Sequence, residues 1–202
     1  MIEFRNVTKS YDGKPVLQDL NLRLEDGKTY ILTGMSGIGK TTLLRLILGL
    51  EKADAGQICR KEPGAGEKQT PGVVFQEDRL CENFDPVTNV KMVCPGMSRS
   101  RVEEELRELL PEDALSRPVR ELSGGQKRRV AVCRAMAGDH GYYVLDEPFT
   151  GLDEETRKKT IAYIRREAEG RMLILAVHDL EGLEFGEEIR LEEKAENPNK
   201  RS

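Results

Sequence analysis

The stretch that decides the fold is Gly34-Met35-Ser36-Gly37-Ile38-Gly39-Lys40-Thr41, which has the spacing of a phosphate-binding loop. The run Thr29 to Thr33 precedes it and has the apolar character of a buried strand, while apolar residues at helical spacing follow it up to Leu50. This strand–loop–helix context is the one in which the motif is diagnostic. The glycines let backbone N–H groups curl around phosphates, and the helix N-terminus adds its positive dipole end. The sequence therefore predicts a nucleotide site, with Lys40 on the β/γ-phosphate oxygens, the Thr41 hydroxyl on Mg²⁺, and Thr42 beside them.

An acidic pair completes this prediction. The apolar run Tyr142-Tyr143-Val144-Leu145 is typical of a buried strand and delivers two adjacent carboxylates, Asp146 and Glu147, at its end. We expect Asp146 to hold Mg²⁺, directly or through water, and Glu147 to polarise the attacking water as a general base. Two solvated carboxylates at a turn before Pro148 would be the simpler interpretation of this pair alone. The phosphate loop upstream favours the functional one.

A second glycine-rich element lies between these two halves. It reads Leu122-Ser123-Gly124-Gly125-Gln126 and opens a predicted helix over 123–137, with Ser123 as its N-cap. A plain helix cap would explain it structurally, and that explanation is compatible with anion binding at a helix N-terminus. One nucleotide site has no use for a second phosphate binder of this kind. The element is therefore a second feature that a single phosphate-loop site does not explain.

Together the three motifs resemble the ATPase subunit of an ATP-binding cassette (ABC) transporter, and the resemblance runs from about Met1 to His178. It implies that Ser123, Gly124, Gly125 and Gln126 face the γ-phosphate of ATP held by an opposite subunit. The working unit would then be a homodimer or a pair with another cassette, with two ATP molecules between the subunits. It also implies ATP and Mg²⁺ as cofactors.

The resemblance assigns several single residues. Gln76, after Val73-Val74-Phe75, matches the glutamine that reaches Mg²⁺ and the attacking water, and His178 matches the histidine that contacts the γ-phosphate. Tyr11 matches the aromatic residue that stacks on adenine, and Asp153 lies in the loop that crosses between subunits. Without the resemblance, the simpler interpretation of each of these residues would be a surface or capping residue. The crossing loop departs mildly from the family, with Thr150-Gly151 where Ser-Ala is common.

The chain as a whole is expected to be an α/β protein. It would have a P-loop NTPase core with a mainly parallel sheet, an N-terminal antiparallel β subdomain and an inserted α-helical subdomain. We treat residues 1–202 as a single ABC ATPase domain, with the helical subdomain at about 77–137 and a polar, frayed tail at 192–202. Glu62 to Pro71 is expected to be a surface loop, and the last strands after His178 are expected to be abbreviated. Glu77 to Pro95, inside the helical subdomain, has an irregular, mixed apolar sequence.

Composition and the distribution of apolar residues limit which partners and which cell compartment are expected. The 202 residues include 32 basic and 36 acidic ones, for a net charge of −4, and this balance argues against direct nucleic-acid binding. No apolar stretch approaches the roughly 20 residues that a membrane span needs. The N-terminus has no signal-peptide pattern, so a cytoplasmic protein is expected. The four cysteines have no Cys-x-x-Cys pairing, and they are expected to be reduced thiols with a structural role.

The leading hypothesis is an ATP-hydrolysing subunit that energises solute transport through a separate membrane permease. Such a subunit would be peripheral on the inner face of the cell membrane, attached through the permease, whose contact is expected at Glu77 to Pro95. Import is favoured because Pro118-Val119-Arg120-Glu121 lacks a Gly-Glu-x-Gly pattern typical of many exporter cassettes. The alternative is a soluble ABC ATPase acting on ribosomes or DNA. A small-molecule kinase would leave residues 122–126 unexplained. A degenerate, binding-only cassette is disfavoured because Lys40, Glu147 and His178 are all present.

Overall fold

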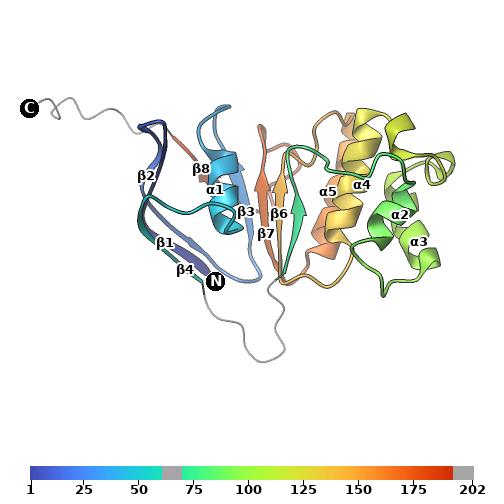
Figure 1. Ribbon diagram of the computed structural model, residues 1–202, viewed down its shortest axis with the longest axis horizontal. Coiled ribbons are helices and arrows are strands. Elements are labelled where there is room, and N and C mark those ends of the chain that lie inside the picture. Colours follow the sequence, from blue (N-terminus) through green and yellow to red (C-terminus); the bar gives the residue numbers. More distant parts are fainter. Residues whose placement is uncertain (61–69, 193–202) are drawn as a thin grey trace, which may run out of the picture.

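The computed structural model describes residues 1–60 and 70–192. In this part of the chain, two sheets stand apart with a helix between them (Figure 1). The larger sheet has five parallel strands in the order β5-β6-β7-β3-β8. Its strands are β3 (Thr29–Thr33), β5 (Pro71–Val74), β6 (Tyr142–Asp146), β7 (Met172–Ala176) and β8 (Glu187–Arg190). The smaller sheet is antiparallel in the order β2-β1-β4, from β1 (Ile2–Tyr11), β2 (Lys14–Leu24) and β4 (Ala55–Arg60). The predicted α/β class is confirmed.

Helix α1 (Lys40–Ile47) fills the space between the two sheets (Figure 1). Its apolar residues Leu43, Leu46 and Ile47 are buried in a cluster that takes Phe4 from β1 and Ile174 from β7. The buried apolar residues attach the helix to both sheets, while Arg45, on its remaining face, is exposed to solvent. The phosphate loop before α1 is thereby attached to a rigid part of the molecule.

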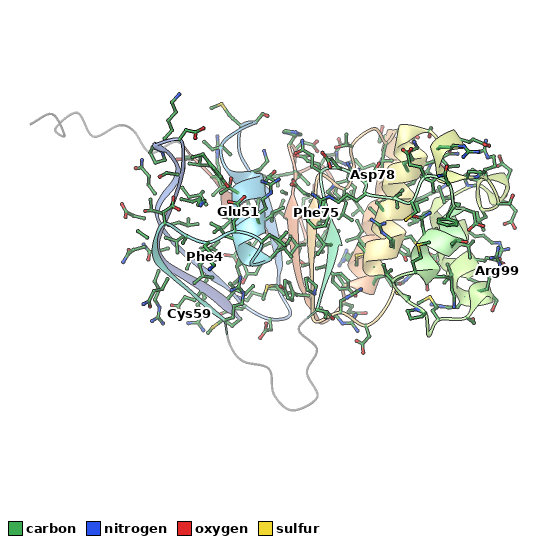
Figure 2. All side chains as sticks on the ribbon, viewed as in Figure 1. Phe4, Glu51, Cys59, Phe75, Asp78 and Arg99 are labelled. Atoms are coloured by element: carbon green, nitrogen blue, oxygen red, sulfur yellow. The ribbon has the colours of Figure 1, made fainter. Side chains whose placement is uncertain are left out.

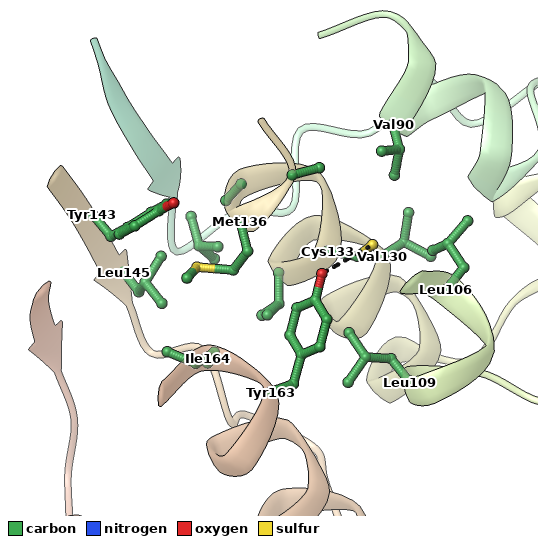
Figure 3. Close-up of a cluster of buried hydrophobic side chains, with 14 of the residues drawn as sticks. Val90, Leu106, Leu109, Val130, Cys133, Met136, Tyr143, Leu145, Tyr163 and Ile164 are labelled. Atoms are coloured by element: carbon green, nitrogen blue, oxygen red, sulfur yellow. Dashed lines mark hydrogen bonds between the residues drawn. The ribbon is translucent and has the colours of Figure 1, made fainter. Parts of the chain in front are cut away.

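The remaining helices lie on the other side of the parallel sheet (Figure 1). They are α2 (Pro86–Lys91), α3 (Arg99–Leu109), α4 (Gly124–Met136) and α5 (Glu154–Glu167), with two short 3₁₀ turns at Glu112–Ala114 and Val119–Glu121. A second hydrophobic cluster joins them to β6, with Tyr163 donating its hydroxyl to Cys133 Sγ at 3.7 Å inside it (Figure 3). Nowhere in the described ranges does a helix have the length and apolar content to cross a bilayer.

Helix starts follow local capping rules. Ser123 accepts from Gln126 N, and the Gln126 side chain accepts from Ser123 N, so α4 opens with a capping box. Asp153 accepts from Thr156 N at the start of α5. Asp85 accepts from Thr88 N at the start of α2, with Pro86 as its first residue.

The structure adds detail to the sequence-based expectation in three places. The span Glu77 to Pro95, which has an irregular sequence within the expected helical subdomain, contains α2, whose Asp-Pro start is a recognisable helix signal. Pro71 is not a loop residue but begins β5, which ends at Val74 rather than Phe75. Of the rest of the expected loop, residues 62–69 lie outside the described residues and only Thr70 is described. A further strand, β8, follows His178 with only four residues. Of the expected tail, only Glu192 is described.

Because the five strands are parallel, their carboxyl ends meet at one edge of the sheet. The phosphate loop leaves the end of β3, and Gln76 follows β5. Glu147 follows β6, and His178 lies two residues beyond β7. The topology alone thus gathers four predicted site segments on one edge.

Candidate nucleotide-binding site

A cavity of about 240 Å³ lies at this edge of the sheet. Residues from the phosphate loop, the start of α1 and the ends of three other strands line it: Ser36, Gly37, Gly39, Lys40, Thr41, Thr42, Gln76, Asp146, Glu147 and His178. This cavity is therefore lined by eight of the residues that the motifs predicted. It is also lined by Gln76 and His178, which were assigned one by one from the family resemblance. The volume and the polar lining suit a phosphate chain rather than an apolar ligand.

The backbone of the phosphate loop depends on its glycines. Gly34, Gly37 and Gly39 all have positive φ, at 142°, 80° and 112°. A Cβ on Gly39 would lie 2.8 Å from a Val16 side-chain carbon, and one on Gly34 would lie 2.8 Å from the Leu191 carbonyl oxygen. Both the conformation and the close approach exclude a side chain at these two positions. No side-chain cap occupies the N-terminus of α1, so its first N–H groups remain available to an anion.

Lys40 is buried, and its ammonium donates to the loop's own carbonyls, Gly34 O at 2.7 Å and Met35 O at 3.4 Å. These contacts hold the charge over the loop without an acidic partner. An ammonium has three donors, so a phosphate oxygen can accept another hydrogen bond from the same group. The geometry therefore fits Lys40 to the contact with the β/γ-phosphates.

Thr41 and Asp146 form the second feature of the cavity. The Thr41 hydroxyl donates to Asp146 Oδ2 at 2.9 Å, which is about the separation of adjacent oxygen ligands around Mg²⁺. Burial raises the pKa of the Asp146 carboxyl, and the Thr41 hydroxyl partly opposes this. A buried carboxylate beside a hydroxyl is the hard oxygen donor set that Mg²⁺ prefers, so these residues fit the metal. No cluster of three or more His, Cys, Asp or Glu ligands occurs in residues 1–60 and 70–192, and Mg²⁺ does not need one.

Glu147 and His178 form the third feature. The His178 Nε2 atom lies 3.1 Å from Glu147 Oε1. The Glu147 side chain is only 15% exposed while that of His178 is 61% exposed, so the carboxylate lies inside the cavity and the imidazole at its rim. Burial raises the pKa of the Glu147 carboxyl, and the nearby His178 and Lys40 lower it in part. A raised pKa makes the carboxylate a better proton acceptor, as a general base requires.

Gln76 reaches the cavity from a segment whose main-chain carbonyls accept hydrogen bonds from arginine side chains of α4. Arg128 is buried and donates to Phe75 O at 2.8 Å and to Gln76 O at 2.5 Å. Arg134 donates to the carbonyls of Arg79 and Asp78, each at 2.8 Å. Figure 2 labels Phe75 and Asp78, the first near the parallel sheet and the second near the helices. In the sequence, 127–129 is only a basic run of the predicted helix, and nothing there marks one of its arginines as buried.

The other assigned residues do not line this cavity. Ser123, Gly124, Gly125 and Gln126 lie at the start of α4, with Ser123 and Gly124 exposed to solvent. Gly34, Met35 and Ile38 belong to the loop without lining the space, and Met35 is 69% exposed. Tyr11, at the end of β1, is 40% exposed and donates its hydroxyl to Glu51. The role of Ser123 to Gln126 on another nucleotide therefore stays a prediction.

The loop after Glu147 contacts the start of α4. A Cβ on Gly125 would lie 2.7 Å from the Gly151 carbonyl oxygen, so the two backbones touch. Gly125 therefore tolerates no side chain, which explains one glycine of the 122–126 motif by packing alone.

The model of the ABC transporter family matches residues 17–150 of this chain. The sulfate/thiosulfate import ATP-binding protein CysA of Nitrosomonas europaea is 38% identical over 179 residues, which are 82% of this chain and 49% of that protein. The taurine import ATP-binding protein TauB of Yersinia pestis bv. Antiqua is 35% identical over 198 residues, 92% of this chain and 76% of that protein. The chain thus spans about half the length of the first of these relatives.

A solved structure agrees with the fold. The dimeric ATP-binding cassette MJ0796, bound to ADP and Pi in a post-hydrolysis state, has a TM-score of 0.83 and 28% identity, covering 95% of this chain and 94% of that one. A second dimeric structure of the same bacterial ABC transporter cassette has a TM-score of 0.81 and 29% identity, with the same coverage. With these similarities and the cavity described above, this chain belongs to the ABC transporter family, as one of its ATP-binding cassettes.

Proposed function

We propose that this chain hydrolyses ATP and that a pair of cassettes containing it drives solute import through a separate membrane permease. The observation that carries the proposal is the meeting of three features in one cavity: the Lys40 ammonium, the Thr41–Asp146 pair and the Glu147–His178 pair. Binding alone would need the first two. A buried carboxylate beside a histidine adds a group that can accept a proton from water.

The residues divide the chemistry between them. Lys40 and the N–H groups of the phosphate loop hold the β/γ-phosphates, and Thr41, Asp146 and Gln76 would hold Mg²⁺. When bound, Mg²⁺ neutralises charge that develops on the phosphate oxygens. Glu147 accepts the proton of the attacking water, and His178 contacts the γ-phosphate from the rim. Tyr11 stacks on adenine, and Ser123 to Gln126 grip the γ-phosphate of the ATP held by the other subunit.

Import and the permease are supported by the relatives. The sulfate/thiosulfate and taurine proteins are both import ATP-binding proteins, as is the spermidine/putrescine protein PotA of Mesoplasma florum, which is 34% identical over 90% of this chain and 55% of its own length. Their solutes differ while their ATP-binding parts are alike, so the permease and its partners would select the solute. The chain would then lie on the inner face of the membrane, attached through the permease. A soluble role on ribosomes or DNA has no comparable support.

The permease is proposed to contact the segment Glu77 to Pro95. Three large apolar side chains of this segment, Phe84, Met92 and Val93, are about half exposed at and beyond the ends of α2. Large apolar groups left in water suit a protein contact rather than a solvated loop. Site-specific crosslinkers at Met92 and at the remote control Lys28 would test this in membranes. Permease adducts at Lys28 but not at Met92 would contradict the assignment.

Hydrolysis is tested by phosphate release from Mg²⁺-ATP. We expect Glu147→Gln to slow turnover by at least about a hundredfold because it removes the base and keeps the shape. Glu104→Gln is the matched control, since Glu104 is an exposed carboxylate on α3, a helix that contributes no residue to the cavity. Equal rates for Glu147→Gln and the wild-type chain would refute the base role.

A further inference from the structure

Arg157, on α5, donates hydrogen bonds to the segment between β7 and β8, which forms neither helix nor strand around Asp179. Its side chain is 16% exposed, and its Nη1 and Nη2 atoms donate to the two carboxylate oxygens of Asp179, at 3.1 and 2.5 Å. Nη2 also donates to the Glu181 carbonyl oxygen at 2.9 Å. The guanidinium holds the pKa of the Asp179 carboxyl below its usual range. Asp179 directly follows His178, so this grip lies one residue from the rim of the cavity.

The same guanidinium contacts the loop that follows the other strand. Its central carbon lies 5.2 Å from the centroid of the Phe149 ring, within the range of a cation–π contact. Phe149 is buried and lies two residues after Glu147. Arg157 therefore touches both segments that carry the Glu147–His178 pair, one after β6 and one after β7.

His178 needs such support because its strand ends before it. β7 stops at Ala176, and the next backbone contact is Val177 N donating to Leu32 O at 3.1 Å. On the other side of His178, the Arg157–Asp179 pair holds the chain. A two-point arginine–carboxylate contact fixes direction as well as distance, which a lysine at the same place could not do.

We propose that Arg157 is a positioning residue that holds Asp179 against the Phe149 loop and so keeps His178 facing Glu147. The proposal rests on the proposed function, because it assigns Arg157 a role only through His178. Arg157 does not line the cavity, so it has no direct contact to offer the nucleotide. Its effect should appear in turnover and not in ATP binding.

The test compares Arg157→Lys and Asp179→Asn with the wild-type chain. Displacement of a reacting group by about 1 Å can cost about a hundredfold, so we expect kcat to fall by about fivefold or more in both variants. KM and the ATP dissociation constant should stay unchanged, while the melting temperature should fall slightly, because the lowered pKa of Asp179 means that the ion pair stabilises the fold. Lys159→Met is the matched control, because Lys159 lies on the same helix in an exposed ion pair with Glu155.

A second measurement separates positioning from mere stability. In a His178→Ala background, Arg157→Lys should cause no further loss of kcat, since the residue that it positions is gone. A loss that multiplies in the double variant, or an unchanged kcat in Arg157→Lys, would overturn the proposal. Normal turnover in His178→Ala alone would instead overturn the role of His178, which belongs to the proposed function.

Discussion

His178 Nε2 lies 3.1 Å from Glu147 Oε1, and this pairing follows from the register of two neighbouring strands. β6 and β7 are paired up to Asp146 and Ala176, and Glu147 N then donates to Ala176 O at 2.9 Å. Glu147 has a φ of 53°, a left-handed conformation that is uncommon for a residue with a side chain. The backbone thus turns directly after the strand, and this turn accompanies the placement of the carboxylate in the cavity. Strain of this kind is typical of functional positions.

The raised pKa of Glu147 predicts a pH-dependent effect on stability. Burial disfavours the ionised carboxylate in the folded protein, so the folded pKa lies above the ordinary value of 4.5. Below that ordinary value the group is protonated in both states and has no effect. As pH rises through the raised pKa, the folded protein bears the full cost of the buried charge. We therefore expect nucleotide-free Glu147→Gln to melt about 1–3 °C above the wild-type chain at neutral pH.

Melting curves that begin below the ordinary pKa, at about pH 4, and extend to about pH 8 check this sign, because the effect develops above the ordinary pKa and levels off above the raised one. The difference between Glu147→Gln and wild type should grow with pH, while Glu104→Gln should show no such trend. A Glu147→Gln variant that is less stable than the wild-type chain at neutral pH would mean that the ionised Glu147 stabilises the fold, which is the opposite of the expected effect.

A second prediction concerns the hydroxyl of Thr41. Thr41→Ser keeps an oxygen beside Asp146, whereas Thr41→Val keeps the shape and removes it. Mutating a residue that only hydrogen-bonds to a metal ligand typically lowers metal affinity about 10- to 100-fold. Loss of a direct ligand should therefore lower the apparent Mg²⁺ affinity by at least about tenfold. Turnover measured against Mg²⁺ at fixed ATP gives this value for both variants. Similar Mg²⁺ curves for Ser and Val would exclude the hydroxyl as a ligand.

Much of the site could be predicted from the sequence because its elements are local. The phosphate loop and the Asp146–Glu147 pair each follow an apolar strand, and parallel strands bring such ends together. The single-residue assignments needed the family resemblance, since an isolated Gln76 or His178 carries no pattern. Both line the cavity, although their roles stay predictions.

The arginine contacts could not be predicted from the sequence for a physical reason. Arg128 bonds to main-chain carbonyls more than 50 positions away, and Arg157 pairs with Asp179 across 22 positions. Only tertiary packing brings these groups together, and surface arginines look the same in the sequence. Helix α2 is a different case, because Asp85 and Pro86 are local signals in the sequence that mark where it starts.

The third prediction concerns Tyr11 and adenine. A stacked ring is worth about 1 kcal/mol, so Tyr11→Ala should weaken ATP binding roughly fivefold. Tyr11→Phe removes only the hydroxyl, which donates to Glu51, and it should bind ATP like the wild-type chain. Titration with a fluorescent ATP analogue, competed by ATP, gives both affinities. Equal losses in the two variants would show that the hydroxyl matters and not the face of the ring.

The last prediction concerns the pairing of subunits. Lys40, Thr41, Asp146 and Glu147 line the cavity of one chain, while the element Ser123 to Gln126 lies apart from it, with Ser123 exposed. If this element grips the nucleotide of a second copy, ATP itself joins the two chains. Glu147→Gln keeps the cavity and slows hydrolysis, so it should run as a dimer with Mg²⁺-ATP and as a monomer without nucleotide in sedimentation experiments.

Substitutions in the nucleotide cavity and in the Ser123 to Gln126 element distinguish ATP binding from the pairing of subunits. Ser123→Arg places a bulky side chain at the start of α4, so in the Glu147→Gln background it should abolish the dimer and leave ATP binding to the monomer intact. Glu104→Gln in the same background should leave the dimer unchanged. Mixing wild-type chain with an equimolar Lys40→Ala chain should give less than full activity, because each site needs both faces. A Glu147→Gln protein that binds ATP yet stays monomeric at high concentration would rule out self-pairing and indicate a different cassette as the obligate partner.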